Sequence, residues 1–252
     1  MAVEIKGYIV PDDDQWIYDW FGIGTTAPQN IRQAIVDANG GPLDVEISTC
    51  YGGDVFSGST MYSALRSYAG GVHIHITGLA ASAASVIAMA GPSDMSPTAQ
   101  LMVHRVSSAA QGNYHAMDTS STALQEADKS IAAAYEAKSG MAEKDALKLM
   151  DNETWITAAH AVELGLVDKI SDAASTQLIN AAYGLPLPRA VIEKTRAMLA
   201  EKKARAGEKP APVGNEANKD VEPQSTSPAE PNAQALALAK AKINLIEKSM
   251  NF

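Results

Sequence analysis

Residues 72–90 read VHIHITGLAASAASVIAMA, and this stretch decides the fold class. Its first part, Val72–Thr77, alternates β-branched apolar residues with polar ones, which is typical of a strand with one buried face. Its second part, Ser82–Ala90, is dominated by small residues with good helix propensity and predicts a helix. A strand that runs through a glycine directly into a helix is the building unit of α/β proteins.

The same alternation extends outward in both directions. We expect further strands at Val3–Val10, Leu43–Ser48, Leu101–Val103 and Leu166–Ile170. We expect helices at Pro28–Asn39, 57–69, 116–138, Ala142–Met150 and Ala158–Leu164, with a glycine-rich turn at Cys50–Asp54. Strands separated by helices imply parallel pairing through right-handed crossovers. The sequence therefore predicts an α/β domain over residues 1–175.

The composition changes after Pro186 and Pro188. We expect a helical extension over 176–205. Residues 206–233 are rich in Pro, Glu, Asn, Ser and Lys, which predicts a disordered linker. The last part, 234–252, has the pattern of a short amphipathic helix, and such a helix has too little surface to fold without a docking partner.

Charge and cysteine content narrow the class of partner. The net charge is −9, and the acidic excess lies in residues 1–188, which argues against nucleic acid as the main partner. A single cysteine excludes an intrachain disulfide and fits a reducing compartment. No signal peptide is evident, and the longest apolar stretch, Gly78–Gly91, is too short to span a bilayer. We expect a soluble cytoplasmic protein that does not enter a membrane.

Ser82 lies within a run of small residues, Gly78-Leu79-Ala80-Ala81-Ser82-Ala83-Ala84-Ser85. Small neighbours let another backbone or a substrate approach, and a helix N-terminus offers free N–H groups to a developing negative charge. Both features suit a nucleophilic serine. Taken alone, however, the run is more typical of an N-cap serine in front of a packing helix.

Two other places in the sequence offer catalytic groups. The pair Gly52-Gly53 can present backbone N–H groups to a ligand, although it is also typical of an ordinary turn. His104 follows an apolar strand and can face the crevice at the strand ends. His73 and His75 share one face of a strand and are expected in a core or interface. No carboxylate has a suitable spacing to them, so no metal site is expected.

The order of these motifs resembles the Clp protease proteolytic subunit family. The chain has Gly52-Gly53 after a strand, then Gly78-Leu79-Ala80-Ala81-Ser82, Met102-Val103-His104, and a later run from Trp155 to Asp168. Within the family it is most similar to the phage and prophage branch of prohead maturation proteases. The resemblance implies the Clp-protease/crotonase-like fold, in which β-β-α units repeat as a superhelix around a parallel sheet, with a long handle helix at 116–138 and here a flexible C-terminal tail.

The resemblance also implies the site residues. Ser82 would be the nucleophile, His104 the general base, and the backbone N–H groups of Gly53 and Ala83 the oxyanion hole. The family usually has aspartate where this chain has Glu153, so Glu153 is expected to orient the histidine, with Asp151 as the alternative. Neither a metal nor another cofactor is implied. Two further groups near the site are expected to be structural, the thiol of Cys50 and the hydroxyl of Ser85.

The family resemblance implies a homo-oligomeric ring that cleaves protein or peptide substrates. The Ala-Ala-Ser-Ala-Ala-Ser run and the tail favour phage head maturation, in the host cytoplasm or prohead, with capsid or scaffold proteins as partners. One alternative is a housekeeping ATP-dependent subunit fed by an AAA+ unfoldase. A third hypothesis is a non-catalytic scaffold that retains the fold.

Overall fold

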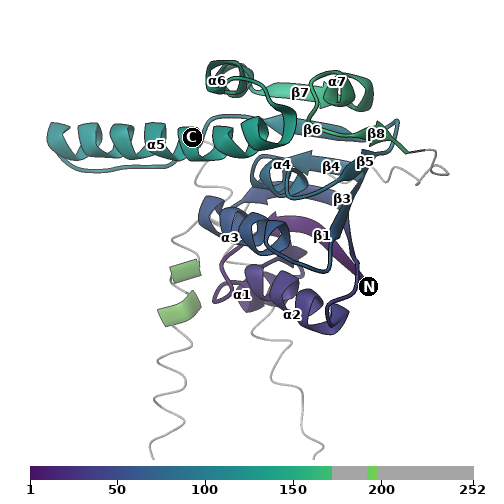
Figure 1. Ribbon diagram of the computed structural model, residues 1–252. Helices are drawn as coiled ribbons and strands as arrows, with labels where there is room; N and C mark the ends of the chain where they lie inside the picture. The colour runs from purple at the N-terminus through teal and green to yellow at the C-terminus, as the bar shows by residue number, and fades with distance from the viewer. Residues whose placement is uncertain (172–191, 194, 198–252) are drawn as a thin grey trace, which may run out of the picture. The chain divides into compact units, whose positions relative to one another are not determined.

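The fold is organised around an eight-stranded sheet. The computed structural model describes residues 1–171, 192, 193 and 195–197 (Figure 1). The strands are β1 (Ala2–Ile9), β2 (Thr25–Thr26), β3 (Leu43–Gly53), β4 (Val72–Ala81), β5 (Ser93–Met95), β6 (Gln100–Val103), β7 (Thr154–Thr157) and β8 (Lys169–Ile170). The strand order is β2-β1-β3-β4-β5-β8, and all of these pairs are parallel.

The sheet divides along β4, and this division creates room for a site. The first half of β4 pairs with β5 through Ile74–Ile76, whereas its second half pairs with β6 through Leu79–Ala81. The strand β6 then pairs with β7, and this pair is antiparallel. The carboxyl end of β4 and the carboxyl end of β6 therefore lie side by side, which is where crevices form in α/β sheets.

Several helices cover the apolar face of the central strands β3 and β4, and the described residues form further helices around the later strands. The helices are α1 (Gln15–Trp20), α2 (Pro28–Ala38), α3 (Val55–Arg66), α4 (Ala83–Ala88), α5 (Tyr114–Ser139), α6 (Glu143–Asp151) and α7 (Ala158–Glu163). The first halves of β3 and β4 alternate between buried and more exposed residues, with Val45, Ile47, Ile74 and Ile76 fully buried in the core. Figure 1 shows α5 running past the edge of the sheet, well beyond the other helices.

The opposite face of the sheet is polar. Here Glu46 accepts a hydrogen bond from Thr77 at 2.9 Å, and Glu4 accepts one from Ser48 at 2.7 Å. Parallel sheets usually have both faces covered and read as continuous apolar runs. The apolar–polar alternation in β3 and β4 is explained by this second face, where side chains from neighbouring strands bond to one another.

The α/β fold with a parallel sheet and a long helix after β6 is confirmed. Four short elements were not expected from the sequence, namely α1, β2, β5 and β7. The predicted turn at Cys50–Asp54 is wrong, because β3 continues to Gly53 and pairs with β1 through Gly7, Tyr8 and Ile9. The strand predicted at Leu166–Ile170 is reduced to its last two residues, since Leu166 and Val167 are buried in a turn.

The described part of the chain has no helix that is both long and apolar enough to cross a membrane. Residues 192, 193 and 195–197, within the expected extension 176–205, are helical. The remainder of that extension, the expected linker 206–233 and the expected helix 234–252 lie outside the described residues.

Candidate active site

Ser82 stands at a sharp corner between β4 and α4. Its φ of 55° and ψ of −123° lie in a region that residues other than glycine rarely adopt. Such a backbone costs about 1–3 kcal/mol and persists only where the surroundings impose it. Its N–H donates to the carbonyl of Met102 on β6 at 2.8 Å. The corner turns the Ser82 side chain out of the strand, as in other strand-to-helix turns that expose a nucleophile.

His104 is the residue that the Ser82 side chain contacts. It follows the last residue of β6, and its Nε2 lies 2.7 Å from the Oγ of Ser82. For the hydroxyl to donate to Nε2, the neutral ring must carry its proton on Nδ1. Both residues are partly buried. The pair of strands β4 and β6 therefore brings together two residues 22 positions apart in the sequence.

The glycine pair Gly52-Gly53 lies directly against Ser82. A Cβ added to Gly52 would stand 2.6 Å from the Cβ of Ser82 and 3.0 Å from the backbone nitrogen of Ala83. Gly52 also has a φ of +83°. Only glycine fits this close approach, which brings the backbone of residues 52 and 53 beside the first turn of α4.

The strand β1 holds the glycine pair in place. Gly53 is opposite Ile9 in the ladder, and a Cβ on Gly53 would collide with the carbonyl of Ile9. The next residue, Asp54, donates its N–H to the same carbonyl at 2.9 Å and caps α3 by accepting from the N–H of Ser57 at 2.7 Å. The ring of Tyr51, the residue before the glycines, packs on that of Tyr8. Strand pairing and ring packing thus both hold this segment in place.

The hydroxyl of Ser85 stabilises the backbone of Ser82 by a hydrogen bond. It donates to the carbonyl of Ser82 at 2.6 Å and lies 2.7 Å from the hydroxyl of Tyr135. Since the single Ser85 proton is used on that carbonyl, the Tyr135 hydroxyl donates to Ser85. Tyr135 belongs to α5 and is buried, and this burial raises its pKa. A chain of hydrogen bonds therefore connects the long helix to Ser82, and sequence reasoning did not identify Tyr135.

Neither acid considered from the sequence contacts His104. Asp151 ends α6, is exposed and accepts from Nε of Arg105 at 2.7 Å. That hydrogen bond lowers the pKa of Asp151. Glu153 is exposed with a φ of 46°, and its carboxylate has no hydrogen-bond partner among the described residues. The Nδ1 atom of His104 likewise has no partner within the described part of the chain.

Asp128 is a second residue that the sequence did not reveal. It is buried on α5, where it accepts from the N–H of Val106 at 2.8 Å and from Arg105 at 3.2 Å. Val106 and Arg105 directly follow His104. The carboxylate of Asp128 therefore ties the segment that carries the histidine to the long helix.

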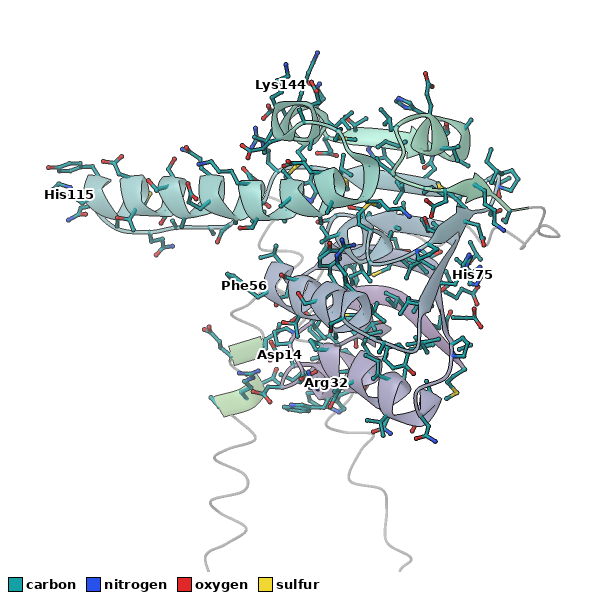
Figure 2. All side chains as sticks on the ribbon, viewed as in Figure 1. Asp14, Arg32, Phe56, His75, His115 and Lys144 are labelled. Carbon is teal, nitrogen blue, oxygen red and sulfur yellow. The ribbon has the colours of Figure 1, made fainter. Side chains whose placement is uncertain are left out.

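The remaining sequence candidates lie away from this centre or are inert. Cys50 is fully buried, and burial raises the pKa of its thiol to about 12, so the reactive thiolate is absent near neutral pH. His115 and His160 are exposed, and Figure 2 shows His115 at the free end of α5. His73 and His75 are half-buried on the open face of the sheet. Of the two expected places, the core is therefore wrong, and an interface stays a prediction.

The chemistry available at the corner is nucleophilic attack by an alcohol. A serine hydroxyl bonded to an imidazole can lose its proton as it attacks, and the backbone of Gly52 lies close to both Ser82 and the backbone nitrogen of Ala83. Among the described residues, the cluster of His, Cys, Asp and Glu side chains that could hold a metal ion does not include Ser82 or His104.

Comparisons with known proteins point in one direction. The family model described as Clp protease matches residues 39–174, more than half of the chain. The chain is 29% identical over 122 residues to an ATP-dependent Clp protease proteolytic subunit from Porphyromonas gingivalis, covering 47% of this chain and 55% of that protein. A subunit of the same name from Bacteroides fragilis is 28% identical over 122 residues, covering 47% and 59%. One from Deinococcus radiodurans is 24% identical over 126 residues, covering 49% and 62%. The chain thus matches a little over half the length of these relatives.

Proposed function

Because this chain belongs to the Clp protease family, we propose that it is a serine endopeptidase with Ser82 as nucleophile and His104 as general base. The observation that carries the proposal is the 2.7 Å contact between Ser82 Oγ and His104 Nε2. The strained corner at Ser82 and the glycine pair packed against it support the same function. An N-cap serine would need neither the histidine nor the positive φ.

The proposed reaction proceeds through an acyl-enzyme. Ser82 Oγ attacks the peptide carbonyl while His104 Nε2 takes the hydroxyl proton. The N–H groups of Gly53 and Ala83 stabilise the negative charge that develops on the carbonyl oxygen. The imidazolium then gives its proton to the leaving amine. Water, activated by the same ring, hydrolyses the ester and restores Ser82.

We assign the orienting acid to Glu153. In the antiparallel pair of β6 and β7, Val103 is opposite Thr154. One further step of that register brings Glu153 opposite His104, whose Nδ1 needs an acceptor. The carboxylate of Asp151 is already bound to Arg105. Glutamate can replace aspartate in this role, since triads with glutamate exist.

The test is covalent labelling of the purified chain by a fluorophosphonate, read by mass spectrometry. The wild type is expected to gain one adduct on the peptide that contains Ser82 and to hydrolyse casein. Ser82→Ala should show neither adduct nor hydrolysis. Ser59→Ala, an exposed serine of α3, is the matched control and should behave as the wild type. Equal casein hydrolysis by wild type and Ser82→Ala would refute the peptidase. A wild type that gains no adduct and hydrolyses no casein would support the scaffold hypothesis.

We propose further that the chain forms a homo-oligomeric ring. The first half of α5 is exposed, and its only buried residues are Asp128, Ala132, Ala134 and Tyr135 in the second half. An isolated stretch of helix is marginally stable in water. Contacts between copies would supply the missing packing, as the handle helix does in the family that the sequence resembles.

The biological role that we propose is processing of scaffold or capsid proteins during phage head maturation. It rests on the small-residue run around Ser82 and on the tail that begins after residue 188. The second candidate is an ATP-dependent housekeeping subunit that works with an AAA+ unfoldase. The names of the curated relatives favour this second role.

Co-expression separates the two roles. A head-maturation protease is expected to shorten a capsid or scaffold protein from the same genome in cells that lack any added unfoldase. Ser82→Ala should leave that protein at full length. An unprocessed capsid protein, together with casein hydrolysis that an added unfoldase stimulates, would favour the housekeeping role.

A further inference from the structure

A cluster of two histidines and two aspartates occupies the open face of the sheet, on the flank away from the helical layer. His73 and His75 come from β4, Asp44 from β3 and Asp94 from β5. Figure 2 shows His75 on the flank opposite Phe56 of α3. The strand register explains the cluster, since Asp44 is opposite His73 and Asp94 is opposite His75. None of these residues takes part in the proposed hydrolysis.

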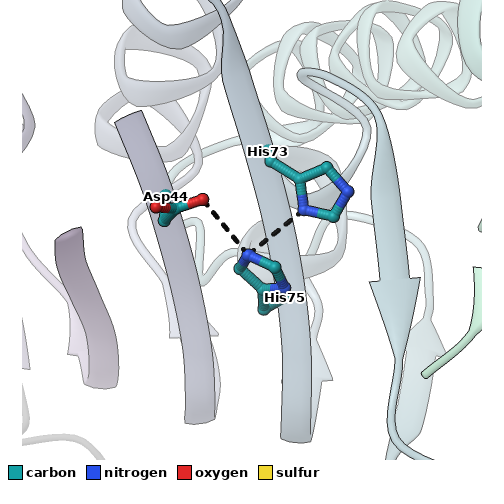
Figure 3. Close-up of side chains that lie close together, drawn as sticks. All are labelled: Asp44, His73 and His75. Atoms are coloured by element: carbon teal, nitrogen blue, oxygen red, sulfur yellow. Dashed lines mark hydrogen bonds and ion pairs between the residues drawn. The ribbon is translucent and has the colours of Figure 1, made fainter. Parts of the chain in front are cut away.

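Three of these side chains converge on one point (Figure 3). The Nε2 atom of His75 lies 3.2 Å from Nδ1 of His73 and 3.4 Å from Oδ1 of Asp44. The three ligand atoms all lie within 4.8 Å of one another. Two nitrogen or oxygen ligands of a tetrahedral zinc ion are about 3.3 Å apart, because each lies about 2.0–2.1 Å from the metal. The distances of 3.2 Å and 3.4 Å from His75 therefore match two edges of such a site.

Asp94 determines which nitrogen of His75 is free. Its carboxylate is nearly buried, with 11% of the side chain exposed, and it lies 3.0 Å from Nδ1 of His75. With its proton on Nδ1, the neutral ring leaves the lone pair of Nε2 close to both the Asp44 carboxylate and Nδ1 of His73. A cation bound at this point would relieve the repulsion between that lone pair and the carboxylate oxygen. A carboxylate that holds a histidine by one nitrogen while the other binds metal is a recurrent arrangement in metal sites.

We propose that His73, His75 and Asp44 bind one divalent transition-metal ion, zinc foremost, with Asp94 orienting His75. Imidazole and carboxylate ligands suit zinc, and the site is accessible because 34–54% of each of these three side chains is exposed. Three protein ligands leave a fourth position for water. The bound ion would link β3 to β4 across the sheet and would neutralise the two aspartates.

Titration of the full-length protein with Zn²⁺ by calorimetry tests the site, and Co²⁺ absorption reports its geometry. The wild type is expected to bind one equivalent and to give visible Co²⁺ bands of a tetrahedral site. Asp44→Asn and His75→Ala should lose at least about 100-fold in affinity, and Asp94→Asn about 10- to 100-fold through loss of orientation. Asp44 is exposed, so its substitution leaves the fold intact by circular dichroism.

Two controls make the outcome specific to this face. His160→Ala, an exposed histidine of α7, should bind as the wild type does. His104→Ala should also bind as the wild type does, which excludes the proposed catalytic histidine as the ligand. The proposal is overturned if wild type and Asp44→Asn bind zinc equally, or if the wild type binds none. In either case the cluster would be a hydrogen-bonded group and not a metal site.

Discussion

Ser82 combines a φ of 55° with a side chain that reaches His104, and hydrogen bonds from separate elements hold it there. Met102 of β6 binds its N–H, and Ser85 binds its carbonyl. Gly52 packs against its Cβ position. At the scale of single residues, the reactive corner depends on neighbours that have no room for larger side chains.

Gly52→Ala is predicted to lower kcat/KM by more than its loss of folding stability can explain. The added methyl would meet Ser82 and the carbonyl of Ala81 at 2.6–2.7 Å and would displace the neighbouring Gly53 N–H. Loss of one oxyanion donor typically lowers the rate about 100- to 1000-fold. The measurement is kcat/KM on a fluorogenic peptide alongside the free energy of unfolding in urea.

Gly71→Ala is the matched control for that substitution. Gly71 has a φ of +84°, nearly the same as the +83° of Gly52, but nothing lies within 4 Å of its added Cβ. It should therefore lose about 1–2 kcal/mol through backbone strain while keeping its kcat/KM. If the two variants lose the same activity, the close approach to Ser82 has no catalytic importance.

Glu153→Gln is predicted to lower kcat about 10³- to 10⁴-fold, because an amide cannot hold the His104 tautomer as a carboxylate does. Asp151→Asn should stay within a few-fold of the wild type, since that carboxylate binds Arg105. Steady-state kinetics on both variants decide the assignment. The reverse ranking would transfer the orienting role to Asp151.

At the scale of elements, side chains of α5 bond to several segments that are distant in the sequence. Tyr135 of α5 reaches Ser85, and Asp128 of α5 holds the segment after His104. At its last turn, Lys138 donates to the carbonyl of Gly91 at 2.9 Å and to Asp168 at 2.5 Å. The two residues of the proposed nucleophile–base pair are thus both supported by one helix.

Asp168→Asn is predicted to lower the free energy of unfolding by about 1 kcal/mol at pH 7, a modest value because half of the Asp168 side chain is exposed and solvent screens the pair. Burial tends to raise the pKa of Asp168, but the bonds from Lys138 and Ser93 outweigh it and the net pKa is lowered. A lowered carboxyl pKa stabilises the fold above the unfolded value of about 3.9.

The difference between wild type and Asp168→Asn should therefore be constant from pH 7 to pH 5 and shrink as the pH falls below about 4. Urea unfolding at pH 7, 5 and 3.5 measures it. Gln125→Ala, which changes an exposed residue of the same helix that does not titrate, is the control and should show no such dependence. A difference that grows on acidification would contradict the assignment.

At the scale of the whole molecule, the exposed half of α5 is the surface expected to join copies of the chain. Met117 is 37% exposed, and Leu124, seven residues later on the same helical face, is only partly buried. Two turns separate them, so they lie on one face of α5 with Ser120 and Ser121 between them. A face of this kind on a helix that runs past the sheet is typical of contacts between subunits.

Leu124→Asp is predicted to dissociate the assembly, because a charge would be buried at the contact. Light scattering after size exclusion should report a multiple of 26.5 kDa for the wild type and a smaller species for the variant. Thr119→Asp places the same charge on another, exposed side of α5 and should keep the wild-type mass. A monomeric wild type would refute the ring.

The sequence by itself determined the α/β class, the long helix and the order of the glycine, serine and histidine motifs. These features depend on local periodicity and on spacing along the chain, which the order of residues contains directly. It also predicted Ser82 and His104 as the catalytic pair, although the local pattern around Ser82 was more typical of a helix cap.

Only the tertiary structure decided the contacts between strands and helices that are distant in the sequence. The 2.7 Å contact of Ser82 with His104 depends on the pairing of β4 with β6, and the support from Tyr135 and Asp128 depends on how α5 packs. The carboxylates near His73 and His75 come from β3 and β5, so no spacing within β4 could predict them. Side chains from different strands become neighbours through register, and register is set by the packing of the whole sheet.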